Sequence, residues 1–139
     1  MTVQMETAQV EIRVGDLVIG NDRPFTLIAG PCQIESESHA VETADFLQAV
    51  TRRLGIGLIY KSSFDKANRT SLTSARGIGA NRGLEILARV RERFSIPVLT
   101  DVHLPEQCAP AAEAVDVLQI PAFLCRQTDL LLAAGETGA

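Results

Sequence analysis

The chain has 139 residues, of which 46% are hydrophobic and 22% are charged, and its formal net charge at pH 7 is −4. This composition is typical of one globular unit with a core, and the acidic balance excludes a general nucleic-acid binder, whose surface would be basic. No apolar run approaches the roughly 18 residues of a membrane span, and residues 1–11 lack the pattern of a signal peptide. We therefore expect a cytoplasmic protein without a membrane or nucleic-acid partner. Its three cysteines, an odd number, are expected to be thiols.

Residues 9–24 carry the pattern of a small β-hairpin. Apolar residues alternate with polar ones on both sides of Gly15-Asp16, a dipeptide typical of a tight turn. The segment precedes the first strand of the predicted core.

From Phe25 onward the chain repeats one unit, in which an apolar strand, a loop and an amphipathic helix follow each other. Strands are predicted at residues 26–29, 58–61, 98–103 and 117–122. Helices are predicted from a cap at Ser36 to Gly55, from a cap at Asn81 to Phe94, at 106–114 and at 128–135. The expected apolar face of the first helix is Ala40, Ala44, Leu47, Val50 and Leu54. Pro110 is expected to kink or shorten the third helix. Apolar strands that alternate with helices predict an α/β fold with a parallel sheet.

Polar or conformationally special residues follow every predicted strand. They are Cys32, then Lys61 and Ser63, then Asp101 and His103, and finally Gln119 with Pro121 and Phe123. Functional residues at the carboxyl ends of successive strands are typical of a TIM (β/α)8 barrel, whereas a dinucleotide fold carries a glycine-rich first turn. We predict a single partial barrel domain over residues 1–139, because four units are about half of such a barrel. A fragment, a truncated gene product and a half-barrel that pairs with another copy all fit this count.

The segment KSSFDKANRTS, residues 61–71, has the composition of an anion-binding site. It places two lysines, an arginine and four hydroxyls directly behind an apolar run. Lysine supplies a point charge, Arg69 a planar fork, and Ser63 or Thr70 a hydroxyl hydrogen bond. A small phosphorylated metabolite fits this site, and a solvated surface loop is the alternative.

Asp101 and His103 stand two residues apart on a predicted strand and therefore point to the same face, beside Lys61 if the barrel prediction holds. They fit acid-base work or the binding of substrate hydroxyls, and an Asp-His pair that only satisfies itself is the alternative. Cys32 stands at the mouth of the first strand, although one cysteine is weak evidence for a metal site. His39 is expected to lie at the surface. Cys108 and Cys125 are expected to pack as small apolar groups.

Four motifs together resemble the 3-deoxy-D-manno-octulosonate 8-phosphate synthases. They are AGPCQIES at 29–36, KSSFDKANRTS at 61–71, TDVH at 100–103 and QIPAFLCRQTD at 119–129. The resemblance runs from near Gly15 to residue 139 and covers about the first half of that family's barrel, with the hairpin as a plug at the bottom. Residues 66–69, Lys-Ala-Asn-Arg, distinguish the chain from related phosphoenolpyruvate-dependent aldolases. The resemblance implies a transferase of lipopolysaccharide precursor synthesis that condenses phosphoenolpyruvate with D-arabinose 5-phosphate.

The resemblance also implies roles for four groups of residues. Lys61 and Lys66, with Ser63 nearby, contact phosphoenolpyruvate; Asn68, Arg69 and Thr70 hold arabinose 5-phosphate; Asp101, His103 and Gln119 line the same pocket; Phe123 and Arg126 reach toward a neighbouring subunit's sugar phosphate. The residues expected to be catalytic are Lys61, Asn68, Asp101 and His103. A homo-oligomer, a tetramer in the family, is implied as well.

Cys32 places the chain in the metal-dependent group of the resembled family, in which a divalent metal of the zinc, iron, cobalt or manganese type binds this cysteine. Its three other ligands are implied to lie beyond residue 139, and no organic cofactor is implied. Two other classes stay open on sequence grounds. One is a sugar-phosphate aldolase with Lys61 as a buried Schiff-base lysine, and the other is a non-catalytic remnant that binds a phosphosugar.

Overall fold

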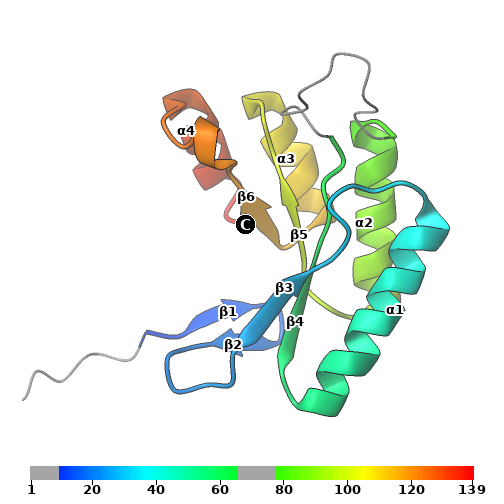
Figure 1. Cartoon of the computed structure of the whole chain (residues 1–139). Helices are drawn as coiled ribbons and strands as arrows, with labels where there is room; N and C mark the ends of the chain where they lie inside the picture. Colours follow the sequence, from blue (N-terminus) through cyan, green and yellow to red (C-terminus); the bar gives the residue numbers. More distant parts are fainter. Residues whose placement is uncertain (1–9, 66–77) are drawn as a thin grey trace, which may run out of the picture.

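The structure, a computed structural model, describes residues 10–65 and 78–139. Within them a parallel four-stranded sheet has the order β3 (Thr26–Ala29), β4 (Gly57–Lys61), β5 (Val98–Asp101) and β6 (Val117–Gln119). The helices are α1 (Glu37–Leu54), α2 (Ala80–Phe94), α3 (Pro105–Ala114) and α4 (Thr128–Glu136), with a 3-10 turn η1 (Ala122–Leu124). Figure 1 shows α1, α2 and α3 on one side of the sheet. The α/β class and the parallel sheet predicted from the repeat are confirmed.

A separate antiparallel pair, β1 (Ile12–Val14) and β2 (Leu17–Ile19), precedes the sheet. Gly15 turns the chain between them with a φ of 56°, a left-handed conformation that glycine adopts without strain. The pair lies against the amino end of β4, because a Cβ added at Gly57 would stand 2.4 Å from a methyl carbon of Leu17. Figure 1 shows the pair at that end of the sheet.

Helix α1 begins and ends where the sequence predicts. The Ser36 hydroxyl accepts a hydrogen bond from the backbone N–H of His39 at 3.2 Å, and Gly55 closes the helix in the left-handed conformation. Its buried face is Ala40, Ala44, Gln48 and Thr51. The expected face was therefore partly wrong, since Leu54 is 60% exposed. Gln48 occupies a core position because its side-chain amide donates to the carbonyl of Phe94 at 2.7 Å.

Helix α2 begins two residues earlier than expected, because its N-cap is Gly79 rather than Asn81. Leu84, Leu87, Val90 and Phe94 recur at helical spacing and are buried on one face of the helix. Gly83 lets the helix approach the chain that follows β4, because a Cβ there would stand 2.4 Å from the Cβ of Phe64.

The last two strands are shorter than predicted, and each ends for a local reason. Strand β5 stops at Asp101 because the N–H of His103 donates to a side chain, Gln107, instead of a neighbouring strand. Strand β6 stops at Gln119, and Pro121 has no N–H to extend the ladder. Pro110 was expected to kink or shorten the third helix. It does not shorten the helix, since α3 runs to Ala114 with Pro110 in its interior.

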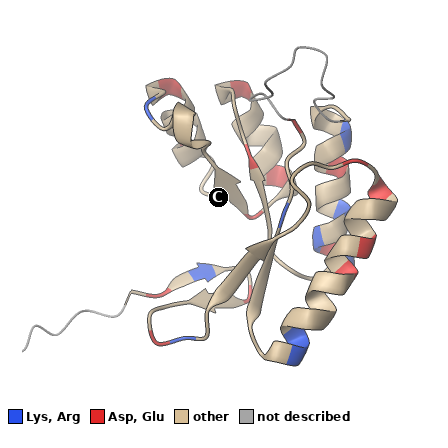
Figure 2. Ribbon diagram, in the orientation of Figure 1, with Lys and Arg blue, Asp and Glu red and all other residues tan. Residues whose placement is uncertain are grey.

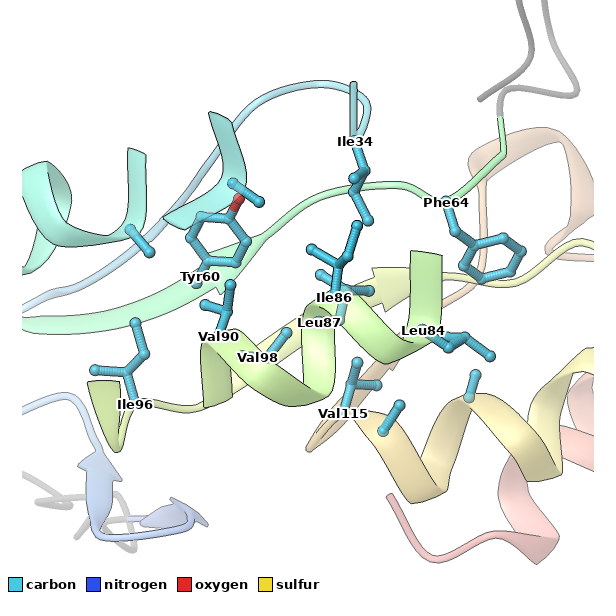
Figure 3. Packing of buried hydrophobic residues seen from close by; sticks show 14 of the residues in the cluster. Ile34, Tyr60, Phe64, Leu84, Ile86, Leu87, Val90, Ile96, Val98 and Val115 are labelled. Carbon is cyan, nitrogen blue, oxygen red and sulfur yellow. The ribbon is translucent and has the colours of Figure 1, made fainter. Parts of the chain in front are cut away.

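The core lies between the sheet and the helices. Tyr60 and Val98 point from neighbouring strands toward Ile86, Leu87 and Val90 of α2 (Figure 3). Burial raises the pKa of the Tyr60 hydroxyl. Because side chains alternate along a strand, the register places a second set on the opposite, inner face of the sheet. These are Ile28 opposite Ile59, and Leu99 opposite Val117.

Apolar surface stays exposed at one edge of the sheet. Phe25 is 67% exposed and Ile28 is 51% exposed, and strands β3 and β6 form the two edges of the four-stranded sheet. We expect residues 1–139, produced alone, to bind an apolar fluorescent dye strongly and to self-associate in sedimentation velocity, because open edges and apolar patches favour association. A monomer with weak dye binding and cooperative unfolding would contradict this.

Within the described ranges, none of the helices is long and apolar enough to cross a membrane.

Candidate active site at the carboxyl end of the sheet

Three polar residues are the last residues of three neighbouring strands. Lys61 ends β4, Asp101 ends β5 and Gln119 ends β6. Lys61 pairs with Leu99, and Asp101 pairs with Gln119, so all three belong to the inward set of the alternation. Lys61 and Gln119 are half-buried, whereas Asp101 is 6% exposed. Most other charged residues lie on the helices and loops, with the sheet largely uncharged (Figure 2).

Asp101 and His103 form a pair directly at the end of β5. His103 Nε2 lies 3.2 Å from Asp101 Oδ2, and the Phe64 ring meets the imidazole edge to face at 6.4 Å between centroids. The two side chains are 12% exposed for His103 and 8% for Asp101. Their other polar atoms, Asp101 Oδ1 and His103 Nδ1, are buried and make no hydrogen bond within the part of the chain that the structure describes. Buried polar atoms without a partner are rare in folded proteins, and His39 Nδ1 and the Tyr60 hydroxyl are two further examples among the described residues. Asp101 and His103 differ from these in that their two atoms belong to one pair at the end of β5.

Behind this face, two buried hydroxyls tie three strand ends together. Ser62 Oγ donates to the carbonyl of Pro31 at 2.8 Å, and Thr100 Oγ1 donates to the carbonyl of Ser62 at 2.8 Å. Both side chains are almost fully buried. Sequence reasoning missed this chain of hydrogen bonds, although its signal was present. Each hydroxyl residue stands next to a predicted site residue, Lys61 or Asp101, at the position that points to the helices.

The loop after β3 runs beside the chain that leaves β4. Gln33 and Ser63 form a parallel β-bridge, and the N–H of Ile34 donates to the Ser63 carbonyl at 3.0 Å. Ser63 is fully buried, whereas Cys32 on the same loop as Gln33 is exposed. The structure thus brings Cys32 and Ser63 into neighbouring segments of one end of the sheet.

The described residues do not by themselves fit a metal centre. In residues 10–65 and 78–139 no group of three or more His, Cys, Asp or Glu side chains stands close enough to hold an ion. Cys32 is the single ligand that the sequence predicts within residues 1–139. One thiolate cannot define a coordination shell, because zinc and similar ions take about four ligands.

The other cysteines and His39 only partly follow the expectations. Cys108 is buried as expected, and burial raises the pKa of its thiol, with a smaller contribution from the Glu106 carboxylate. Cys125 is exposed, so its predicted packing role was wrong. His39, in the first turn of α1, is half-buried.

The remaining predicted site residues fall into two groups. Phe123 is 91% exposed, and Arg126 is exposed as well, both on the segment between β6 and α4. They stand outside the cluster of strand ends. The loop residues Lys66, Asn68, Arg69 and Thr70 lie outside the described residues.

The fold and the site define an α/β protein with a parallel four-stranded sheet, consistent with a partial aldolase-type barrel whose polar groups gather at the carboxyl ends of its strands. Residues 2–139 match the model of the DAHP synthetase I family, and the chain belongs to this family.

Curated relatives match nearly the whole chain. A protein of Granulibacter bethesdensis is 65% identical over 139 residues, which are 99% of this chain and 49% of that protein. A protein of Rhodopseudomonas palustris is 64% identical over 91% of this chain and 44% of its own length, and one of Brucella canis is 58% identical over 96% and 48%. Each is named 2-dehydro-3-deoxyphosphooctonate aldolase. The chain thus spans about half the length of the curated relatives it matches.

Proposed function

We propose that this chain supplies the first half of the active site of a synthase that condenses phosphoenolpyruvate with D-arabinose 5-phosphate to give 3-deoxy-D-manno-octulosonate 8-phosphate and phosphate. The observation that carries the proposal is the cluster of Lys61, Gln119 and the Asp101–His103 pair at adjacent strand ends. The chain that carries this cluster is 58–65% identical to relatives named 2-dehydro-3-deoxyphosphooctonate aldolase.

In the proposed reaction, C3 of phosphoenolpyruvate forms a bond to the aldehyde carbon of arabinose 5-phosphate. Water adds at C2, and phosphate leaves by cleavage of the C–O bond. Both substrates are anions, so the first demand on the site is positive charge. Lys61 at the end of β4 supplies it beside the phosphoenolpyruvate, and we assign Lys66, Asn68, Arg69 and Thr70 to the same task on the loop that follows.

The Asp101–His103 pair fits proton transfer during this addition. When Asp101 Oδ2 accepts a hydrogen bond from the Nε2–H of His103, the tautomer that carries its proton on Nε2 presents Nδ1 as an acceptor. We assign Nδ1 as the acceptor of a proton from the attacking water, which is supported by its burial and by the lack of a hydrogen bond to the described residues. We assign Gln119 to a substrate hydroxyl, which is supported by its position opposite Asp101 in the register.

The direct test is turnover by a polypeptide of full barrel length. A chimera that joins residues 1–139 to the remaining half of the Granulibacter bethesdensis relative, called the barrel-length chimera below, is expected to release phosphate only when both substrates are present. Borohydride should trap no substrate adduct on either of the chain's two lysines, Lys61 and Lys66. A trapped adduct would favour the Schiff-base aldolase. Binding of arabinose 5-phosphate without phosphate release would favour a non-catalytic phosphosugar protein.

We further propose that Cys32 contributes one thiolate to a divalent metal whose other ligands come from polypeptide outside residues 1–139. Chelation is expected to lower the rate of phosphate release by the barrel-length chimera by a factor of about ten or more, because a bound metal ion stabilises the charge that develops in the transition state. Zinc, iron or cobalt should restore it, because a thiolate favours the softer ions over magnesium. The checks are metal content and phosphate release, with Cys32→Asn as the variant and Cys125→Asn, at the other exposed cysteine, as the matched control. Full activity of the Cys32 form after exhaustive chelation would refute the assignment.

Three structural expectations belong to the same proposal. Residues 1–139 form part of a single barrel domain, and β1 and β2 cover its amino-terminal end, which the contact of Leu17 with Gly57 supports. Phe123 and Arg126 serve a homo-oligomer, a tetramer, in which they face a neighbouring subunit; the exposure of both supports this. A cytoplasmic location fits the proposed phosphorylated substrates.

A further inference from the structure

The first turn of α3 contains a glutamine whose side chain turns back toward the site. Gln107 Oε1 accepts a hydrogen bond from the backbone N–H of His103 at 2.8 Å and another from that of Leu104 at 3.2 Å. Two N–H donors facing one atom also settle the orientation of the amide, because only its oxygen can accept.

These two bonds are made where the chain leaves the sheet. The N–H of Val102 still donates to the Gln119 carbonyl of β6, at 3.1 Å. One residue later the N–H of His103 turns to Gln107, so the side chain takes over the role that the strand ladder plays up to Val102. Leu104, the N-cap of α3, has no polar side chain to cap the helix. Gln107 is therefore the residue that fixes both the start of α3 and the backbone of His103.

Two printed distances describe how the imidazole of His103 is held by residues that the structure describes. Asp101 lies 3.2 Å from Nε2, and the Phe64 ring meets the imidazole edge to face. Both act on the ring, whereas the Gln107 bond acts on the main chain from which the ring projects. A rotation of the peptide before His103 would carry Nε2 away from Asp101.

We propose that Gln107 is a positioning residue, which holds His103 against Asp101 by accepting the N–H groups of His103 and Leu104. The inference rests on the proposed function only in taking His103 as a residue of the site.

The geometry can be tested without turnover, because His39 and His103 are the two histidines of the chain. In the barrel-length chimera with labelled histidine, the ring ¹H–¹³C correlations of His103, assigned from their loss in His103→Gln, are expected to shift in Gln107→Leu, which keeps most of the volume of the side chain but loses the acceptor. Those of His39, on α1, should stay in place. Gln107→Glu should restore the His103 positions, because a carboxylate oxygen accepts both N–H groups and suits a helix N-terminus. Unmoved His103 signals in Gln107→Leu would overturn the proposal, as would equal shifts of both histidines that Glu does not reverse.

Kinetics of the barrel-length chimera give the second readout. Gln107→Leu is expected to lower kcat about tenfold to a hundredfold, the scale for a small misplacement of a reacting group. KM for phosphoenolpyruvate should change by less than about twofold, because Gln107 lies in α3, after β5, whereas Lys61 lies at the end of β4. Gln107→Glu should recover most of kcat. An unchanged kcat in Gln107→Leu would overturn the proposal. If the unmutated chimera releases no phosphate, the proposed function fails, whereas the histidine spectra still decide the role of Gln107.

Discussion

Lys61→Met in the barrel-length chimera is expected to lower kcat/KM for phosphate release by about 10²–10³-fold, comparable to removal of one donor that stabilises developing charge. Methionine keeps most of the length and of the apolar stem but loses the ammonium group. Lys61 is half-buried at the end of β4, so its charge is less screened by solvent than that of a surface lysine. The measurement is the initial rate of phosphate release over a range of phosphoenolpyruvate concentrations.

Two further variants separate the charge of Lys61 from its fit. Lys61→Arg keeps the charge on a planar group and should recover only part of the activity, because a guanidinium does not replace a compact ammonium at a fixed position. Arg53→Met removes an exposed cation from the last turn of α1 and should leave kcat/KM within about twofold, since isolated surface charges contribute little. A Lys61→Met variant as active as Arg53→Met would remove Lys61 from the site.

Local sequence signals were sufficient to predict the helices and strands next to which the site residues lie. Ser36 and Gly55 fix the two ends of α1 through capping chemistry that involves only neighbouring residues. The apolar runs of β3 and β4 and the stripe of α2 have periods that sequence displays directly. Errors occurred where a distant group decides the outcome. Gln48 entered the core because the carbonyl of Phe94 accepts its amide, and no local pattern contains that partner.

The same distinction applies to the candidate site. Alternation along β5 was enough to predict that Asp101 and His103 share a face, and the structure brings them to 3.2 Å. The hydroxyls of Ser62 and Thr100 were missed because their acceptors are backbone carbonyls of neighbouring strands. Gln107 was missed for a related reason, since it lies in a predicted helix and its side-chain oxygen faces backward to residues 103 and 104. The residue types that carry chemistry were predictable, whereas the residues that hold them in place were not.

Gly30→Ala is expected to lower the free energy of unfolding of the barrel-length chimera by about 3 kcal/mol or more, in the range reached by backbone clashes in packed cores. A Cβ at this position would lie 1.9 Å from the carbonyl oxygen of Lys61 and 3.2 Å from its nitrogen. Both atoms belong to the backbone of β4, so no side-chain rotation relieves the contact. The loop that carries Cys32 must move away from β4, or β4 must move away from β5. The measurement is denaturant unfolding of the variant and of the unmutated chimera.

The matched control is the same substitution at Gly135, near the end of α4, where an added Cβ meets no atom within 4 Å. Gly135→Ala should raise the free energy of unfolding by up to about 1 kcal/mol, because alanine loses less conformational freedom in a helix than glycine does. The two substitutions therefore add one methyl group each and are expected to have opposite signs. Gly30→Ala should also lower phosphate release more than its loss of stability explains, because the displaced carbonyl belongs to Lys61. Equal stability of the Gly30→Ala and Gly135→Ala variants would show that the chain after β3 does not lie as close to β4 as the structure places it.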